Sequence, residues 1–212
     1  MRTERDFEQY LENIKQMAAE EGYDTLDSTY IEHLKCRFFG QELVIGRSAR
    51  IILREMKMSD LEEFYGFEDA KEEAVLQTFL KKSKEASEEH LGAYIANMYP
   101  MFDYGIWTVE RVEDGAVIGM CGLGNPTIDG AECTDLGYYI CPKCRNQGFA
   151  TEAVEIALDY AKNYLEFPLI CAIIKEENRI SEGILRKFGF QFQKQCEKSG
   201  QKISVYQKEL KG

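Results

Sequence analysis

Hydrophobic positions recur at three- and four-residue steps in two stretches at the start of the chain, a spacing typical of amphipathic helices. One stretch covers residues 4–20 and stops at Gly22, and the other covers residues 29–38 and stops at Gly40. The apolar positions are Phe7, Tyr10, Leu11, Ile14, Met17 and Ala18, followed by Tyr30, Ile31, Leu34 and Phe38. Because short isolated helices are marginal in water, we expect this face to pack on the main core, the alternative being a second copy of the chain in a homodimer.

Short runs of β-branched, aromatic and other apolar residues predict strands in the rest of the chain. The predicted strands are residues 51–54, 104–112, 116–123, 135–141 and 167–174, with two closing strands about a turn at Ser199-Gly200. Asp114-Gly115 suits a hairpin turn, because glycine accepts a positive φ. Between the first two strands the pattern is helical to about residue 98, and Ser59 with Glu62 has the spacing of a capping box that opens the first helix.

The stretch from Asp135 to Tyr164 combines a strand with a long amphipathic helix. Pro142 ends the strand because it has no N–H to give to a ladder. Gly148 lies in the connection, where a glycine allows a sharp turn or a close approach to a ligand. The unpaired N–H groups and the positive dipole of the helix start then favour an anion, so this stretch predicts a phosphate site.

A second helix is predicted to begin at Asn178, a good N-cap residue, and to end at Gly189 behind Arg186 and Lys187. This helix and the connection around Gly148 resemble segments of a known protein family. Arg145, Gly148 and Ala150 fill the fixed positions of motif A of the GNAT superfamily of N-acetyltransferases, Gln/Arg-x-x-Gly-x-Gly/Ala after a strand. The spacing of Asn178 and Ser181, with the LGYYI-x-P wording, is most similar to the branch that includes ribosomal-protein N-terminal alanine acetyltransferases.

The resemblance spans about residues 50–210. It implies an α/β (α+β) fold with a mixed, mostly antiparallel central sheet of six to seven strands flanked by helices. Residues 1–49 would form an N-terminal helical extension, and residues 50–212 the acetyltransferase domain. The resemblance also implies acetyl-CoA as co-substrate and no metal.

Site residues follow from the resemblance in the same way. The residues implied for cofactor binding are Ile140, Cys141, Arg145, Asn146, Gln147, Gly148, Phe149, Ala150, Thr151 and Asn178. Ser181 is the candidate that protonates the leaving thiolate, although it and Asn178 also fit simple helix capping. Asp135 is the candidate general base, with Glu132 a weaker substitute, and an ordinary solvated strand-end carboxylate is the alternative.

The composition of the chain limits which binding partners, cellular location and metal sites we expect. The net charge of −11 argues against nucleic acid and anionic membrane surfaces and fits a cationic partner. With no apolar run of about 20 residues and a charged amino terminus, we expect a cytoplasmic protein. Cys141 and Cys144 form a Cys-x-x-Cys, but zinc would need a second pair, so we expect ordinary thiols.

The sequence therefore predicts transfer of an acetyl group from acetyl-CoA to a primary amine of a small molecule or of a peptide amino terminus. The alternative is an acyl-CoA sensor or scaffold of the same fold without turnover. A partner-binding role of the amino-terminal helices is compatible with either, because function belongs to sites and not to folds.

Overall fold

The computed structural model describes residues 2–22, 25–69, 74–198 and 200–210. The helices are α1 (Glu4–Glu20), α2 (Ser28–Phe39), α3 (Asp60–Gly66), α4 (Ala74–Gln77), α5 (Lys84–Phe102), the 3-10 turn η1 (Pro142–Cys144), α6 (Phe149–Asn163) and α7 (Arg179–Lys187). The strands are β1 (Val44–Arg47), β2 (Ile51–Arg54), β3 (Ile106–Arg111), β4 (Val117–Gly124), β5 (Thr127–Ile128), β6 (Ala131–Glu132), β7 (Asp135–Ile140), β8 (Leu169–Lys175), β9 (Gln191–Lys198) and β10 (Gln201–Glu209). Ser199, part of the last predicted turn, lies outside the described residues.

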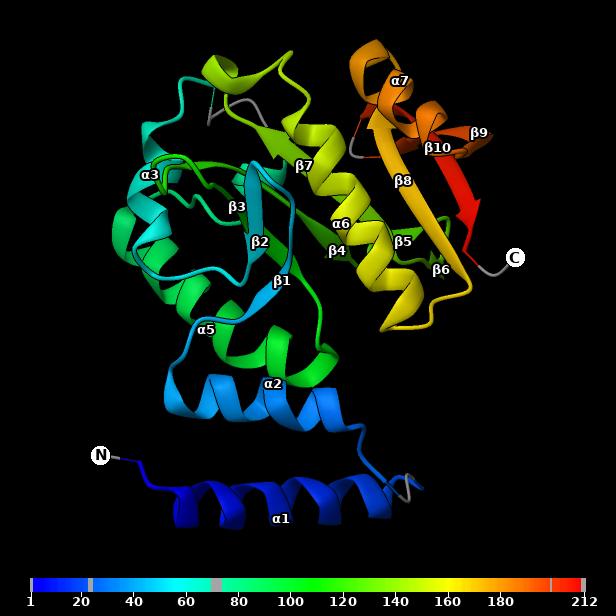
Figure 1. Ribbon diagram of the computed structural model, residues 1–212. Coiled ribbons are helices and arrows are strands. Elements are labelled where there is room, and N and C mark those ends of the chain that lie inside the picture. The colour runs from blue at the N-terminus through cyan, green and yellow to red at the C-terminus, as the bar shows by residue number, and fades with distance from the viewer. Residues whose placement is uncertain (1, 23–24, 70–73, 199, 211–212) are drawn as a thin grey trace.

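Eight strands form the main sheet, in the order β1-β2-β3-β4-β7-β8-β10-β9 (Figure 1). Neighbouring strands are antiparallel except β7 and β8, which are parallel. The predicted mixed, mostly antiparallel sheet is thus confirmed. It has one strand more than the six to seven expected, and residues 44–47 of the expected helical extension form its first strand, β1.

Helices cover both faces of this sheet. On one face, α6 presents a buried stripe that includes Val154, Ala157 and Ala161 to β1, β2, β4 and β7. On the other, Phe64 of α3 and Leu91 of α5 pack with Met120 in a second cluster. The start of α6 and the helix α7 lie near the carboxyl ends of β7 and β8, at the top of the view (Figure 1).

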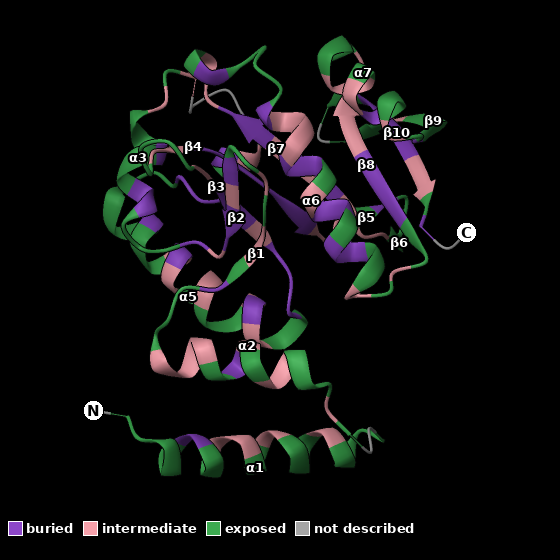
Figure 2. Cartoon of the chain, in the orientation of Figure 1, coloured by how far each residue is buried: buried purple, intermediate pink, exposed green. Residues whose placement is uncertain are grey.

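The two amino-terminal helices lie at the opposite end of the molecule (Figure 1). Leu34 of α2 is buried, and Tyr30 donates to the Pro100 carbonyl of α5 at 3.0 Å. Phe7 of α1 packs on Phe38 of α2, with ring centroids 5.5 Å apart. The predicted packing on the main domain is therefore seen for α2, whereas α1 is mostly exposed and rests on α2 (Figure 2).

The capping box predicted at Ser59 is wrong. The Ser59 side chain makes no capping bond, and the next residue, Asp60, turns into the protein instead. Its carboxylate receives two bonds from Arg54, at 2.8 and 2.9 Å, and one from the Thr108 hydroxyl at 2.6 Å. Ser59 itself is in the right-handed helical conformation, at φ −64° and ψ −25°, and not in the extended conformation from which an N-cap side chain bonds the first turn. Within the described ranges, no helix is long and apolar enough to cross a membrane.

Candidate functional site

The strands β7 and β8 form a parallel pair only at their start. In the described part of both strands the ladder has a single pair, Asp135 opposite Cys171, and the Cys171 amide donates to the Thr134 carbonyl at 2.8 Å. Because parallel neighbours normally continue to exchange main-chain bonds, the end of the ladder marks the point where the strands separate. The edge of β7 that faces β8 is therefore open toward its carboxyl end.

Asp135 lies at the point where the two strands separate. Its carboxylate accepts a hydrogen bond from the Ile173 amide of β8 at 2.8 Å, in the place that a main-chain carbonyl of β7 would fill in a continued ladder. Burial raises the pKa of Asp135 to about 7, against the smaller opposing effects of the Ile173 amide and of Lys198. A carboxyl group that titrates near neutral pH can accept a proton under physiological conditions.

A tyrosine of strand β7 bonds to the first turn of helix α7. The Tyr138 hydroxyl donates to the Ser181 carbonyl at 3.2 Å, and burial raises the pKa of Tyr138 to about 12. Asn178 is the N-cap of α7, and its side chain accepts from the Ser181 amide at 3.0 Å. The capping role considered for Asn178 is thus present, and Ser181 stands in the first turn of the helix beside a tyrosine of the central strand.

Between β7 and α6 the chain forms an uncapped helix start. Gly148 is the N-cap residue, in the left-handed region at φ 88°, and it has no side chain with which to cap. Each of the other helices of nine or more residues in the described chain has a side chain bonded to a first-turn amide; these caps are Thr3, Asp27, Ser83 and Asn178. The first amides of α6 are therefore left for solvent or for a bound group.

A basic side chain lies against this helix start. Arg50, from the turn between β1 and β2, donates from Nε to Glu152 at 2.7 Å, and its guanidinium carbon is 4.7 Å from the centre of the Phe149 ring. A Cβ atom built on Gly148 would be 3.1 Å from Arg50 Nη2. Ser48 holds the second Glu152 oxygen at 2.6 Å. The start of α6 thus combines free amides and a positive dipole end, which favour an anion, with an arginine that is ion-paired to Glu152.

Arg145 folds back onto the end of β7. Its Nε donates to the Ile140 carbonyl at 2.8 Å, and its Nη2 contacts Asp69 at 2.5 Å. The Cys141 amide donates to the Ile118 carbonyl of β4 at 2.8 Å, and the Cys141 carbonyl accepts from Cys144 at 2.9 Å. Main-chain direction alternates along a strand, so the amides of Ile140 and Tyr138 face the open edge, whereas that of Cys141 does not.

The Cys-x-x-Cys forms no disulfide, and all seven cysteines are free thiols. Burial raises the pKa of Cys141 to about 11, with a further contribution from its neighbour Cys144. Cys144 is buried and lies 3.7 Å from Arg111 Nη1. A thiol held protonated in this way is a poor nucleophile at neutral pH. Among the described residues, no three His, Cys, Asp or Glu side chains gather as a metal site.

A family profile described as "Acetyltransferase (GNAT) domain" matches residues 50–191. The chain belongs to the GNAT acetyltransferase family. Among curated proteins it is similar to the uncharacterized protein YkkB of Bacillus subtilis, 29% identical over 107 residues, which are 50% of this chain and 62% of YkkB. The chain spans less than two thirds of the length of YkkB and of a second curated relative, the uncharacterized N-acetyltransferase YoaA of Bacillus subtilis.

Solved GNAT structures share the fold. A GnaT-family acetyltransferase from Bordetella pertussis superposes with a TM-score of 0.67 at 16% identity, covering 79% of this chain and 99% of that one. The ribosomal L7/L12 α-N-protein acetyltransferase RimL, solved in complex with coenzyme A, gives 0.63 at 14% identity, covering 78% and 97%. At these identities the likeness concerns the fold alone.

In this GNAT chain the predicted site residues lie at the two ends of β7 and at the start of α7. Asp135 is at the start of β7, where the strands separate. The segment from Ile140 to Thr151, which includes Asn146 at φ 59° and Gln147 with its side chain bonded to the Lys143 carbonyl, is at the end of β7 and leads into α6. Ser181 contacts Tyr138 of β7 through its main-chain carbonyl, and Asn178 caps the same turn of α7.

Sequence reasoning missed Tyr138, Arg50 and Asp69. Tyr138 stands inside the LGYYI run, where alternation gave no reason to single it out from Tyr139. Arg50 is 102 residues from Glu152, so no local pattern links them. Asp69 has no sequence signal toward Arg145, which lies 76 residues away.

Proposed function

We propose that this protein transfers an acetyl group from acetyl-CoA to a primary amine of a small molecule or of a peptide amino terminus. One observation carries the proposal: an uncapped helix start, with an arginine against it, lies next to the open edge of the central strand β7. Such a helix start suits a phosphate group, and an open strand edge offers main-chain groups to an extended chain.

Coenzyme A matches both features. Its pyrophosphate would meet the amides from Gln147 to Thr151 at the start of α6, beside the Arg50–Glu152 ion pair. The amide-bearing pantetheine arm would lie along β7 and meet the main chain of Ile140 and Tyr138. Arg145 contacts Asp69 and the Ile140 carbonyl, so in this proposal its side chain shapes the end of the strand as well as the phosphate site.

The chemistry requires a neutral amine, which attacks the acetyl carbonyl carbon as the carbon–sulfur bond breaks. The attacking nitrogen must lose a proton, and Asp135, with a pKa of about 7, is the proposed acceptor, directly or through water. The departing thiolate must be stabilised or protonated. The Ser181 hydroxyl is the proposed donor, and the Tyr138 phenol, whose pKa of about 12 keeps it protonated, is a second donor at the same place.

The net charge of −11 supports a cationic acceptor, since amines are mostly protonated at neutral pH. The acceptor itself is chosen by pocket walls, which differ widely among proteins of one fold. RimL acts on a protein amino terminus, according to its name, so a peptide acceptor stands beside small amines in the proposal.

The direct test is release of free thiol from acetyl-CoA, followed with a thiol reagent, across polyamines, aminoglycosides, amino acids and peptide amino termini. We expect amine-dependent release with at least one class, and none with the matching N-acetylated compound. Tight binding of coenzyme A without release in any class would favour the sensor or scaffold alternative.

A further inference from the structure

Glu152 places a negative charge beside the start of α6, where the phosphates of coenzyme A are proposed to bind. It is the acidic residue in the first turn of this helix. Its amide donates to the Gly148 carbonyl at 3.1 Å, so Glu152 directly follows the three amides that have no partner in the helix. A carboxylate in this place stabilises the start of an empty helix, but an uncompensated carboxylate would repel a bound phosphate.

Ser48 and Arg50, from the turn between β1 and β2, hold both oxygens of the Glu152 carboxylate. Ser48 donates from Oγ to one oxygen at 2.6 Å, Arg50 donates from Nε to the other at 2.7 Å, and Arg50 Nη2 contacts that same oxygen. Ser48 is itself fixed, because its Oγ accepts from the amides of Arg50 and Ile51, both at 3.1 Å. We call Ser48, Arg50 and Glu152 together the Glu152 clamp.

The Glu152 clamp lies next to the turn at Gly148. A Cβ atom built on Gly148 would be 3.1 Å from Arg50 Nη2. The Arg50 side chain is 48% exposed and that of Glu152 is 22% exposed. An ion pair of this exposure contributes little to the stability of the fold. What distinguishes this pair is its position beside the free amides of the helix start.

The turn that carries the two partners of Glu152 is held at a fixed place along α6. The strand that leads into it, β1, packs directly on this helix. At Gly46 of β1 the approach is so close that a Cβ atom would lie 2.6 Å from Ile156 Cγ2. A side chain larger than hydrogen would therefore push β1, and the turn after it, away from α6.

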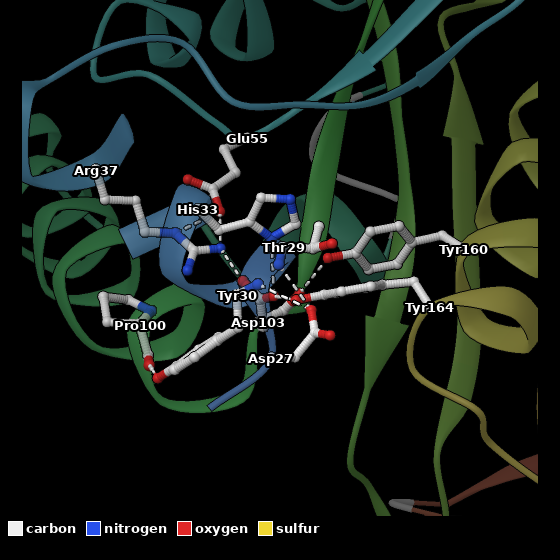
Figure 3. Close-up of polar contacts among 10 residues, drawn as sticks. All are labelled: Asp27, Thr29, Tyr30, His33, Arg37, Glu55, Pro100, Asp103, Tyr160 and Tyr164. Carbon is white, nitrogen blue, oxygen red and sulfur yellow. Dashed lines mark hydrogen bonds and ion pairs between the residues drawn. The ribbon is translucent and has the colours of Figure 1, made fainter. Parts of the chain in front are cut away.

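Farther back along the chain, α2 is anchored near the opposite end of α6 (Figure 3). Arg37 of α2 contacts the Asp103 carboxylate at 2.5 Å, and His33 contacts it at 2.8 Å. The same carboxylate accepts from the Tyr164 hydroxyl, and the Asp103 carbonyl accepts from the Tyr160 hydroxyl at 2.9 Å. Tyr160 is in the last turn of α6 and Tyr164 is its C-cap. The segment 28–50 is thus tied to α6 near both of its ends.

We propose that the Glu152 clamp makes the phosphate site favourable for coenzyme A. Ser48 and Arg50 neutralise the Glu152 carboxylate and fix it in place, and Arg50 acts through Glu152 rather than by touching the phosphates. The inference rests on the proposed function, because coenzyme A is the ligand. Ser48 and Arg50 are then positioning residues, and the turn between β1 and β2 takes part in cofactor binding although it lies far from the β7–α6 connection in sequence.

Calorimetry with coenzyme A on four forms of the full chain tests this role, namely the wild type, Arg50→Ala, Glu152→Gln and the double variant. Arg50→Ala leaves the carboxylate uncompensated and should weaken binding about tenfold at low salt. The loss should shrink at high salt, because screening weakens the repulsion. Glu152→Gln removes the charge and should bind at least as tightly as the wild type. The double variant should recover to within about threefold of the wild type, since no charge is left to repel the phosphates.

Lys84→Ala is the matched control. Lys84 is 50% exposed and pairs with Glu62 on the other face of the sheet, so its removal should leave the affinity unchanged. A double variant as weak as Arg50→Ala would show that Arg50 meets the phosphates itself, and would overturn the proposal. Wild-type affinity in Arg50→Ala, or weakened binding in Glu152→Gln, would overturn it as well. Absence of binding to the wild type would instead refute the proposed function, and this role with it.

Discussion

Asp60 and Asp135 are both withdrawn from water, but their carboxyl groups behave in opposite ways. Asp60 is buried, and burial alone would raise its pKa; bonds from Arg54, Thr108 and the Lys57 amide outweigh burial and lower it. Asp135 is half-buried and receives one main-chain amide, and burial raises its pKa to about 7. The balance between burial and hydrogen-bond partners decides the charge state of each carboxyl group. The first carboxylate stabilises the fold, and the second is left able to exchange a proton.

The largest expected effect is on stability, at Asp60. Asp60→Asn removes the charge that compensates the buried Arg54, and we expect a loss of about 3–5 kcal/mol in the free energy of unfolding. Urea denaturation measures it. Asp135→Asn is the matched control, since the amide oxygen can still accept from Ile173. Equal losses for the two variants would remove the contrast between the two carboxylates.

A variant at Ser181 tests whether the start of α7, which lies beside β7, takes part in the reaction. If its hydroxyl assists the departing thiolate, Ser181→Ala should lower kcat about a hundredfold and leave KM for acetyl-CoA nearly unchanged. Asn178→Ala, which removes the cap, should instead cost about 1 kcal/mol of stability. A Ser181→Ala variant that is less stable but has an unaltered kcat would assign Ser181 to the helix alone.

The raised pKa of Asp135 predicts a dependence of stability on pH. The folded value is about 7 and the unfolded value about 3.9, so between these pH values the folded state keeps a proton that the unfolded state has lost. This group's contribution to stability is therefore full below pH 4 and is lost as pH rises to 7, by at most about 1.4 kcal/mol per pH unit.

Asp135→Asn should abolish that slope in urea titrations at pH 4 to 8. In the wild type, kcat/KM should rise as the carboxyl group ionises, and the variant should lack this limb. An unchanged pH–rate profile in Asp135→Asn would exclude the residue as the base, even if the stability slope disappears.

The smallest effect is expected at the Cys-x-x-Cys. Cys141→Ser with Cys144→Ser should leave the fold intact, because each thiol acts as a small buried group. Elemental analysis of the purified wild type should find no stoichiometric zinc. One zinc per chain would show that the pair is a ligand set after all.

Local patterns predicted the elements that are continuous in sequence. The strand before Pro142, the helix after Gly148 and the hairpin at Asp114-Gly115 all follow from periodicity and turn chemistry, and the structure has them. The second helix, from Asn178, is present with its predicted cap. The resemblance added the mixed, mostly antiparallel character of the sheet, which periodicity alone does not determine.

Long-range partners could not be predicted in this way. Ser59 and Glu62 fit a local capping box by sequence, whereas Asp60, which lies between them, meets Arg54 only on the folded sheet. Arg37 meets Asp103 across 66 residues, and Arg50 meets Glu152 across 102. The separation of β7 from β8 is likewise a property of register, which neither strand's sequence reveals. The Arg50–Glu152 contact and the separation of the strands set the surroundings of the candidate site, and no local pattern predicts either of them.

The central claim is that the uncapped start of α6 binds coenzyme A, and calorimetry with one pair of glycine variants tests it most directly. Gly148 and Gly115 both have positive φ, so glutamate is strained at either position, but only Gly148 lies at the start of α6. We predict one-site binding to the wild type and to Gly115→Glu, and no detectable binding to folded Gly148→Glu, where a side chain and a negative charge would meet the phosphates. Wild-type affinity in Gly148→Glu, or no binding by the wild type, would contradict the account.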